Sequence, residues 1–261
     1  MFRQNWLKNR LRAGRKSLGL WLAMGSPAAA EIVALAGYDF ALIDLEHGPG
    51  DIENAVAQMQ AMSAAPTTAL VRVASNDTLY IRRALDAGAE GIMVPMVESA
   101  GEAAAAVAAC RFPPRGIRGS ATSLVRAADY GMREADYIEG FEDNLLILCQ
   151  IETLKGIDNI EEIAGVEGVD LLFVGPSDIS TAMGFATERD HPEVKAMLAR
   201  VESAIKGCGK WMGTVPRYGM SPPELFALGY DMVSGGSDSG HIRKAGVAQM
   251  KAHREANDGA E

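Results

Sequence analysis

Short apolar runs recur along this chain and alternate with longer amphipathic stretches. Eight runs predict strands, at residues 18–24, 39–45, 68–73, 90–94, 145–151, 169–175, 210–214 and 230–235. Most of them lack a strict alternation of apolar and polar side chains, which is typical of parallel strands that are buried on both faces. Helical patterns lie between most of the strands, at 51–62, 79–87, 100–110, 192–206 and 222–228. Eight such units in 261 residues favour a closed (β/α)8 barrel, or TIM barrel, over an open sheet.

The N-terminal stretch allows two interpretations. Six basic residues between positions 3 and 16 precede the first apolar run, as they would in a secretory leader. That run is short, however, and Gly25, Ser26 and Pro27 interrupt it. We therefore expect a first barrel strand there, with the basic stretch as a helix that caps the bottom of the barrel. No run approaches the roughly 20 apolar residues of a membrane span, so we predict one barrel domain over residues 1–261 and no membrane partner.

Composition narrows the class of protein. The net charge of −9 argues against a nucleic-acid partner, because such proteins usually carry a basic stripe. The cysteines at 110, 149 and 208 show no metal-binding or redox spacing, which is typical of reduced thiols in a cytoplasmic protein. The polar connection between Phe112 and Asn144 is long enough to predict a lid or a binding loop.

Two carboxylates follow neighbouring predicted strands. Glu152 comes after the fifth strand and Asp178 after the sixth, and the C-terminal ends of barrel strands meet at the mouth. Two carboxylates completed by water are a typical site for Mg²⁺ or Mn²⁺. The alternative for each residue alone is a helix N-cap. Their placement together predicts a divalent-metal site, with Co²⁺ as a further candidate and no organic cofactor.

His47 follows the second predicted strand, and Arg72 lies at the end of the third. A histidine held by the Gly48-Pro49-Gly50 turn suits a general base, because the side chain titrates near neutrality; an ordinary exposed turn histidine is the alternative. The forked donors of an arginine suit a carboxylate or a developing oxyanion. For Arg72 the alternative is a buried structural ion pair with Asp44 or Glu46.

Other strand ends suggest anion binding. The backbone amides of Ser177 and Asp178, after Gly175-Pro176, can hold a substrate carboxylate. The glycine-rich run at 235–240 is a weak phosphate signal, since plain turns use the same residues. No lysine lies within a predicted strand except Lys210, which opens the seventh. Because an imine mechanism needs a lysine at the site, its absence favours activation of a carbonyl by a metal.

Several motifs together resemble a known family. They are Asp44-x-Glu46-His47-Gly-Pro, Val71-Arg72 with Asn76-Asp77, Leu85-Asp86-x-Gly88, Val94-Pro95-Met96-Val97, Pro113-Pro-Arg-Gly-Ile-Arg-Gly119, Gln150-Ile-Glu152-Thr153 and Val174-Gly-Pro-x-Asp178. In this order, from about Gly19 to Ala248, the chain resembles the metal-dependent class II pyruvate aldolases of the HpcH/HpaI family, including those acting on 4-hydroxy-2-oxoheptanedioate and 2-keto-3-deoxy sugar acids.

The resemblance implies a phosphoenolpyruvate/pyruvate-type barrel and a role for each matching residue. His47 is then the base and Arg72 the group that stabilises the transition state, while Glu152 and Asp178 bind the divalent metal. Gln150 and the main chain of Ser177 and Asp178 hold the substrate; some relatives have Ala in place of Ser177, which a backbone donor tolerates. The family also implies a homohexamer, built as a trimer of dimers.

Asp86 matches the carboxylate that raises the basicity of the histidine. It lies at the end of a predicted helix that runs back toward the barrel bottom, so it should not reach His47 in its own subunit. We expect it to reach His47 of a neighbouring subunit, with Asp44 as the competitor within the chain. Arg126, in the long connection, is a weaker candidate for contact with an aldehyde.

The expected reaction is reversible aldol cleavage of 4-hydroxy-2-keto acids through a metal-stabilised enolate. It gives pyruvate, or a nucleophile such as hydroxypyruvate, and an aldehyde. One rival is a lyase for malyl or citramalyl thioesters, which should carry a basic cluster for the nucleotide. The other is a non-catalytic binder of keto acids. The sequence does not specify the aldehyde.

Overall fold

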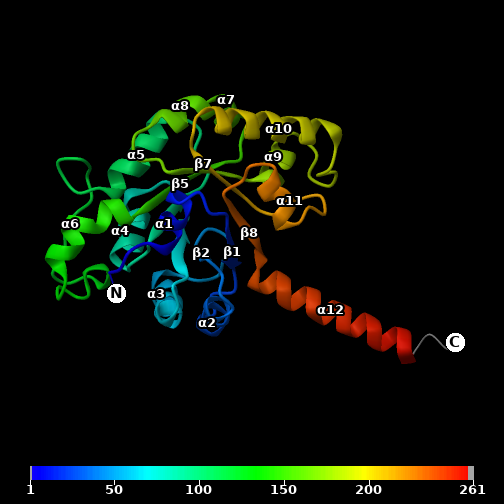
Figure 1. Cartoon of the computed structure of the whole chain (residues 1–261), viewed down its shortest axis with the longest axis horizontal. Helices are drawn as coiled ribbons and strands as arrows, with labels where there is room; N and C mark the ends of the chain where they lie inside the picture. Colours follow the sequence, from blue (N-terminus) through cyan, green and yellow to red (C-terminus); the bar gives the residue numbers. More distant parts are fainter. Residues whose placement is uncertain (1, 258–261) are drawn as a thin grey trace.

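Eight parallel strands close into a barrel in chain order (Figure 1). The computed structural model describes residues 2–257 of the chain. The strands are β1 (Ser17–Leu22), β2 (Phe40–Asp44), β3 (Thr68–Arg72), β4 (Gly91–Val94), β5 (Leu146–Ile151), β6 (Leu171–Val174), β7 (Trp211–Thr214) and β8 (Met232–Ser237). β8 pairs with β1 and closes the sheet. The predicted (β/α)8 barrel is confirmed, with strand ends within a few residues of those expected.

Helices accompany the strands, and all but the first and the last of those described surround the barrel and connect its strands. They are α1 (Trp6–Arg12), α2 (Pro27–Leu35), α3 (Ile52–Ala61), α4 (Thr78–Asp86), α5 (Ala100–Cys110), α6 (Glu134–Asn144), α7 (Leu154–Asp158), α8 (Ile160–Gly165), α9 (Pro176–Ala182), α10 (Pro192–Gly207), α11 (Pro222–Ala227) and α12 (Asp238–Asn257), with short 3₁₀ turns η1 (Met62–Ala64) and η2 (Arg126–Ala128). Side-chain caps define several starts; Asp51 accepts from Asn54 N and Ser99 from Glu102 N. Among residues 2–257, no helix has the length and apolar character needed to cross a membrane.

The interior of the barrel is filled by alternate residues of the strands. Phe40 and Leu42 of β2, Leu70 of β3 and Leu148 of β5 belong to one buried cluster inside the barrel. Because side chains alternate across a strand, the next inward position on β2 is Asp44, on β3 Arg72 and on β5 Gln150. The periodicity that builds the core therefore places polar groups in the uppermost interior layer.

Helix α1 closes the lower end of the barrel. Leu7 and Leu11 belong to the interior cluster, and both side chains are buried. Asn5 caps the helix by accepting from the Lys8 amide, and its own amide nitrogen donates to the carbonyls of Glu90 and Asn144. The expected capping helix is confirmed, and the apolar run after it is strand β1.

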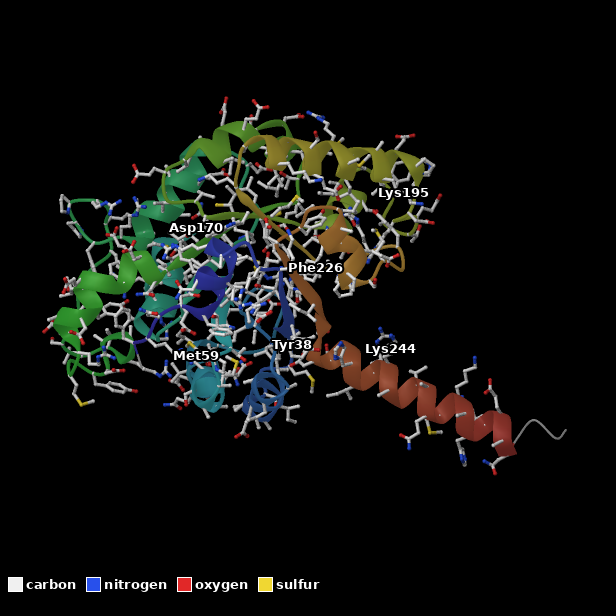
Figure 2. The ribbon with its side chains drawn as sticks, viewed as in Figure 1. Tyr38, Met59, Asp170, Lys195, Phe226 and Lys244 are labelled. Atoms are coloured by element: carbon white, nitrogen blue, oxygen red, sulfur yellow. The ribbon has the colours of Figure 1, made fainter. Side chains whose placement is uncertain are left out.

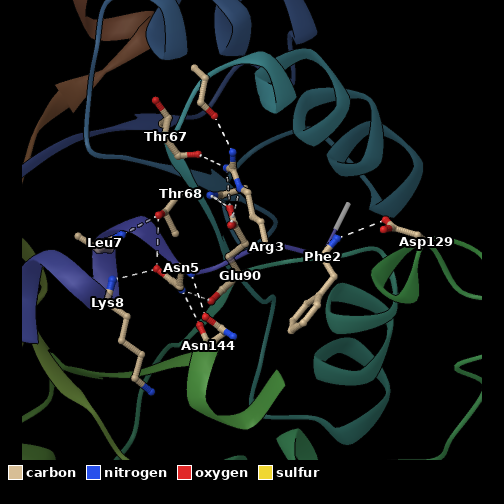
Figure 3. A network of polar contacts seen from close by, with 12 residues as sticks. Phe2, Arg3, Asn5, Leu7, Lys8, Thr67, Thr68, Glu90, Asp129 and Asn144 are labelled. Carbon is tan, nitrogen blue, oxygen red and sulfur yellow. Dashed lines mark hydrogen bonds and ion pairs between the residues drawn. The ribbon is translucent and has the colours of Figure 1, made fainter. Parts of the chain in front are cut away.

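A repeated carboxylate motif surrounds α1 at the barrel bottom. Each even-numbered strand is preceded by an acidic residue, namely Asp39, Glu90, Asp170 and Asp231. Their carboxylates accept hydrogen bonds of 2.9 to 3.0 Å from the second amide of the preceding strand, at Leu18, Ala69, Ile147 and Met212. Each also forms an ion pair of 2.9 to 3.1 Å with a cation of the N-terminal segment, which are Arg10, Arg3, Lys8 and Lys16. Figure 3 shows one of them, Arg3, between Glu90 and the carbonyl of Thr67.

The long connection from α5 to β5 lies at the bottom of the barrel and not over the mouth. It runs from the end of a helix to the start of a strand, and in a βα barrel such connections lie at the N-terminal ends of the strands. Arg126 within it donates to the carbonyl of Ala87, just beyond α4. The expected lid and the proposed contact of Arg126 with an aldehyde are therefore wrong for the barrel mouth of its own chain.

Helix α12 extends away from the barrel (Figure 1). Every residue from 241 to 257 is exposed, in contrast to the other long helices, which bury one face on the sheet. Figure 2 shows the side chain of Lys244 and those beyond it standing free of the barrel.

Candidate active site

Arg72 and Asp44 form a forked ion pair at the barrel mouth. They are opposite each other in the register of β2 and β3. Arg72 Nε donates to Asp44 Oδ1 at 2.9 Å and Nη2 to Oδ2 at 2.7 Å, while Nη1 lies 2.9 Å from Glu46 Oε2. The guanidinium also stacks on Trp21, 4.3 Å from the ring centre. The ion pair considered above as a structural alternative is present, and it holds Arg72 rigidly with N–H groups to spare.

Asp44 also organises the turn that carries His47. Its Oδ1 accepts hydrogen bonds from the amides of Glu46 and His47, at 3.1 and 3.2 Å. Burial alone would raise the pKa of Asp44, but the hydrogen bonds and charge of Arg72, with these amides, hold it below the ordinary value. A Cβ at Gly48 would lie 2.3 Å from the Asp44 carbonyl oxygen, so the turn requires glycine.

The imidazole of His47 stands out from this turn. Its side chain is 72% exposed, and its nearest carboxylate is Glu46, with Nε2 to Oε2 at 4.0 Å. Asp44 contacts the backbone of His47 and not its ring, so it does not act as the competitor for the imidazole that we expected.

Glu152 and Asp178 border the same small space. Glu152 directly follows β5 and is 4% exposed, while Asp178 lies in the first turn of α9. A Cβ at Gly175 would lie 2.9 Å from Glu152 Oε2 and 3.4 Å from Asp178 Oδ2. The glycine therefore leaves open the point at which the two carboxylates meet.

Burial raises the pKa of Glu152 to about 7. The negative charges of Asp178 and Glu46 act in the same direction, whereas the amide of Met96, which donates to Glu152 Oε1 at 2.9 Å, opposes them. A buried carboxylate beside other carboxylates is costly unless a cation neutralises it.

The donor set fits a hard divalent cation. It consists of two carboxylates from neighbouring strand ends, and Mg²⁺ commonly takes one or two carboxylates with water or substrate completing its shell. Within residues 2–257, no group of three or more His, Cys, Asp or Glu side chains gathers around one point, so protein ligands alone do not complete a site. Gln150 donates to Glu152 Oε2 at 2.8 Å, and its own Oε1 is buried without a partner. That oxygen is left to a ligand or a water.

The amides of Ser177 and Asp178 face the same edge of the mouth. The first hydrogen bond within α9 runs from the Ile179 amide to the Gly175 carbonyl. The two preceding amides have no partner within the helix and can receive an anion. Ser177 Oγ accepts a hydrogen bond of 3.1 Å from Arg189 Nη1.

Asp86 lies at the opposite end of the barrel from His47. It is the last residue of α4, and its Oδ1 accepts from Arg118 Nη2 at 2.8 Å. Arg118 is fully buried, stacks near three aromatic rings and donates to Tyr137 Oη at 2.8 Å. The side chain of Asp86 keeps 24% of its surface exposed, so the expected contact with another subunit stays a prediction.

The glycine-rich run at 235–240 spans the end of β8 and the start of α12, and it contains its own carboxylate. Asp238 is 5% exposed and accepts from the amides of Ala23 and Met24, at 3.0 and 3.2 Å. A buried negative charge at this point disfavours a phosphate, which agrees with the weak sequence signal.

Three residues near the site were missed in the sequence. Trp21 supports Arg72, and Arg189 contacts Ser177. Met96 adopts a left-handed backbone, with φ of 54°, which directs its amide at Glu152. The position of Met96 after Val94-Pro95 in a matching motif was a signal, but a positive φ at methionine cannot be read from residue type.

Comparisons with known proteins agree with this geometry. The sequence model described as HpcH/HpaI aldolase/citrate lyase matches residues 17–245. A 4-hydroxy-2-oxo-heptane-1,7-dioate aldolase of Escherichia coli is 39% identical over 245 residues, which cover 94% of this chain and 93% of that protein.

Solved structures agree as well. An HpcH/HpaI aldolase/citrate lyase family protein from Burkholderia cenocepacia superposes with a TM-score of 0.91 at 37% identity, covering 96% of this chain and 100% of that one. An HpcH/HpaI aldolase from Desulfitobacterium hafniense gives 0.88 at 28% identity, covering 96% and 97%. The prediction of an aldolase-type carbon–carbon lyase is confirmed.

Proposed function

Since this chain belongs to the HpcH/HpaI aldolase/citrate lyase family, we propose that its mouth cleaves 4-hydroxy-2-keto acids to pyruvate and an aldehyde, and runs the reverse condensation. The single observation that supports this most is the meeting of the Glu152 and Asp178 carboxylates at Gly175, beside the rigid guanidinium of Arg72. Hydroxypyruvate is a second nucleophile of the same chemistry. Substrates related to the diacid of the Escherichia coli relative are the first to test.

Glu152 and Asp178 would hold a divalent cation, for which we propose Mg²⁺ or Mn²⁺. Such a cation, when bound, supplies the charge that acidifies the C3 protons of a 2-keto acid. Arg72 keeps free N–H groups after pairing with Asp44, and these stabilise negative charge as it develops on the keto oxygen.

His47 is the proposed base. Its imidazole is exposed at the mouth. In the condensation it takes the C3 proton of the keto acid and gives a proton to the oxygen of the aldehyde; in the cleavage it takes the proton of the C4 hydroxyl and gives one to C3. The amides of Ser177 and Asp178 orient the keto acid by its carboxylate end. Gln150 contributes to the substrate site by donating to Glu152, and its free Oε1 accepts from a water or a donor group beside the keto acid. The aldehyde half of the substrate then extends toward the open mouth, where we expect fewer contacts with the protein.

Exchange of the C3 protons of pyruvate tests this proposal without any knowledge of the aldehyde. In D₂O with Mn²⁺ or Mg²⁺, the methyl signal of pyruvate should decay in the presence of the protein, and EDTA should stop the decay until metal is restored. A non-catalytic keto-acid binder would leave the signal intact. Full activity in chelator, or trapping of pyruvate on the protein by borohydride, would instead indicate a lysine mechanism.

We also propose that the protein is a homo-oligomer, with the hexamer implied by the resemblance as the first candidate. Helix α12 supports this, because Ile242, Val247 and Met250 are at least half exposed on a helix that leaves its own barrel. The cysteines form no disulfide, and on this basis we propose a cytoplasmic location for a single-domain protein.

We propose that Asp86 acts across a subunit interface of this oligomer. Its exposed edge can contact His47 of another copy, since within one chain the two residues lie at opposite barrel ends. Co-expression of H47A and D86A chains should restore part of the activity that each variant lacks alone. Light scattering should show mixed oligomers, and mixed oligomers without any restored exchange would contradict a role across subunits.

A further inference from the structure

Arg189 brings a positive charge to the edge of the mouth where the keto acid carboxylate is expected. Its Nη1 donates to Ser177 Oγ at 3.1 Å, and its Nε donates to the Ala186 carbonyl at 3.3 Å. Neither contact involves a negative charge, and no carboxylate within residues 2–257 forms an ion pair with this guanidinium. Arg189 is exposed, and its Nη2 group remains available to a ligand.

The segment that carries Arg189 is held in place by its own contacts. Phe185 precedes Arg189 in the chain and His191 follows it, and their rings stack on each other with their centres 4.0 Å apart. The His191 amide donates to the Glu188 carbonyl, and His191 Nδ1 accepts from the Glu193 amide at the start of α10. An arginine on an ordered segment loses less side-chain freedom when it binds a ligand.

The neighbouring acidic residues do not neutralise Arg189. Asp190, next in the chain, lies 4.0 Å from Lys195 Nζ. Arg72, the other basic group of the mouth, is already paired with Asp44 and Glu46. Arg189 therefore keeps its charge available for an incoming anion.

The charge of the mouth makes such a group useful. Asp44, Glu46, Glu152 and Asp178 lie there, in a chain with a net charge of −9. Arg72 and a bound divalent cation together supply three positive charges against these four carboxylates, so a further cation on its path favours the approach of a keto acid anion. Ser177 joins Arg189 directly to the position proposed for the keto acid carboxylate.

We propose that Arg189 binds the C1 carboxylate of the 2-keto acid together with Ser177, and so selects an anionic nucleophile at a mouth that is otherwise negative. The inference rests on the proposed function and adds to it a side chain that recognises the charge of the keto acid. Because the contact is made to the unreacting carboxylate, it affects binding of pyruvate more than the chemical step.

Arg189→Gln tests the proposal, with Arg189→Lys as the conservative variant. In the metal-loaded protein, R189Q should raise the KM of pyruvate in the C3 exchange roughly 3- to 10-fold with little change in kcat, the range expected for an exposed charge-assisted contact. R189K should recover part of the affinity. The dissociation constant of pyruvate, followed by NMR titration, should rise by the same factor and depend less on salt than in the parent.

Arg200→Gln is the matched control. Arg200 is also exposed, but it pairs with Asp158 on the outer helices, so its removal changes the net charge equally without touching the mouth. It should leave the KM of pyruvate unchanged. A smaller rise is expected for Ser177→Ala, which removes the Oγ that anchors Arg189 but keeps the backbone amide.

Two results would overturn the inference. One is a pyruvate KM and dissociation constant in R189Q equal to those of R200Q. The other is a rise in the KM of the aldehyde instead of pyruvate, which would place Arg189 on the other half of the substrate. Absence of C3 exchange in the metal-loaded parent would be a failure of the proposed function, and the NMR titration with pyruvate would still decide the role of Arg189.

Discussion

The two ends of the barrel both gather carboxylates but balance their charge differently. At the bottom, each of the four carboxylates before the even strands is paired with its own cation from the first 16 residues. At the mouth, Asp44, Glu46 and Glu152 all feel the single charge of Arg72, with Asp178 close by. The bottom is closed by its own residues, whereas at the mouth the carboxylates outnumber the cations, which are Arg72 among them and Arg189 at the edge.

This contrast separates carboxylates that stabilise the fold from those that are candidates for ligand binding. The carboxylates at the bottom also accept a hydrogen bond from a backbone amide of the preceding strand. Each of them therefore connects two neighbouring strands to the N-terminal segment. Glu152 accepts a hydrogen bond from the Met96 amide, but its pKa is still raised to about 7 because burial and neighbouring negative charge outweigh that contact. A group that is held in place but not neutralised is a candidate for ligand binding.

The largest effect is expected for Glu152→Gln. The change keeps the shape of the side chain but removes one of the two carboxylates proposed to hold the metal, and activity should fall by about 10³-fold or more, since cation binding is worth several kcal/mol. In chelator the variant should be as stable as the parent or more stable, because a buried and repelled charge is gone. Thermal unfolding with and without Mn²⁺ should show that only the parent gains stability from the metal. An E152Q protein that still responds to Mn²⁺ would place the cation elsewhere.

Arg72→Lys should have the next largest effect. A lysine keeps the charge but cannot donate to both Asp44 oxygens and to Glu46 at once. We expect kcat for C3 exchange to fall by about 10²-fold and the free energy of unfolding to fall by about 2 kcal/mol. Arg10→Lys at the bottom is the control, and it should lower stability slightly without changing kcat. Equal loss of kcat in both variants would mean that the two ends are not independent.

Lys8→Met should affect folding alone. Lys8 is buried, and its ammonium contacts Asp170 and the carbonyl of Leu145, so its removal leaves both without their cation. Urea unfolding should show a loss of about 2 kcal/mol, less than for a fully buried pair because Asp170 is partly exposed. The matched variant Lys16→Met removes a more exposed pair and should cost about 0.5 kcal/mol or less. Loss of activity in a folded K8M protein would contradict the separation of the two ends.

Much of the difference between the two ends of the barrel could be predicted from the sequence. The order of strands and helices determines at which end of the barrel each loop lies. Glu152 and Asp178 follow strands and Arg72 ends one, and each lies at the mouth as expected. Arg126 precedes a strand, and the same rule places it at the bottom; the length of its loop, taken as a sign of a lid, was the weaker argument. The basic N-terminal residues predicted a capping helix, but not that their charges would match four carboxylates spread over more than 190 residues.

Apolar periodicity and motif order are local properties of the chain, and they were enough to predict the barrel, its closure by the N-terminal helix and the strand ends at which the proposed site lies. The tertiary structure was needed to establish the partners: Arg72 with Asp44, Asp86 with Arg118, and Arg189 with Ser177. It also decided the left-handed turn of Met96 that holds Glu152. The physical reason is that hydrogen bonds and ion pairs depend on distances of a few ångströms between distant residues, and only the register of the closed sheet brings those residues together.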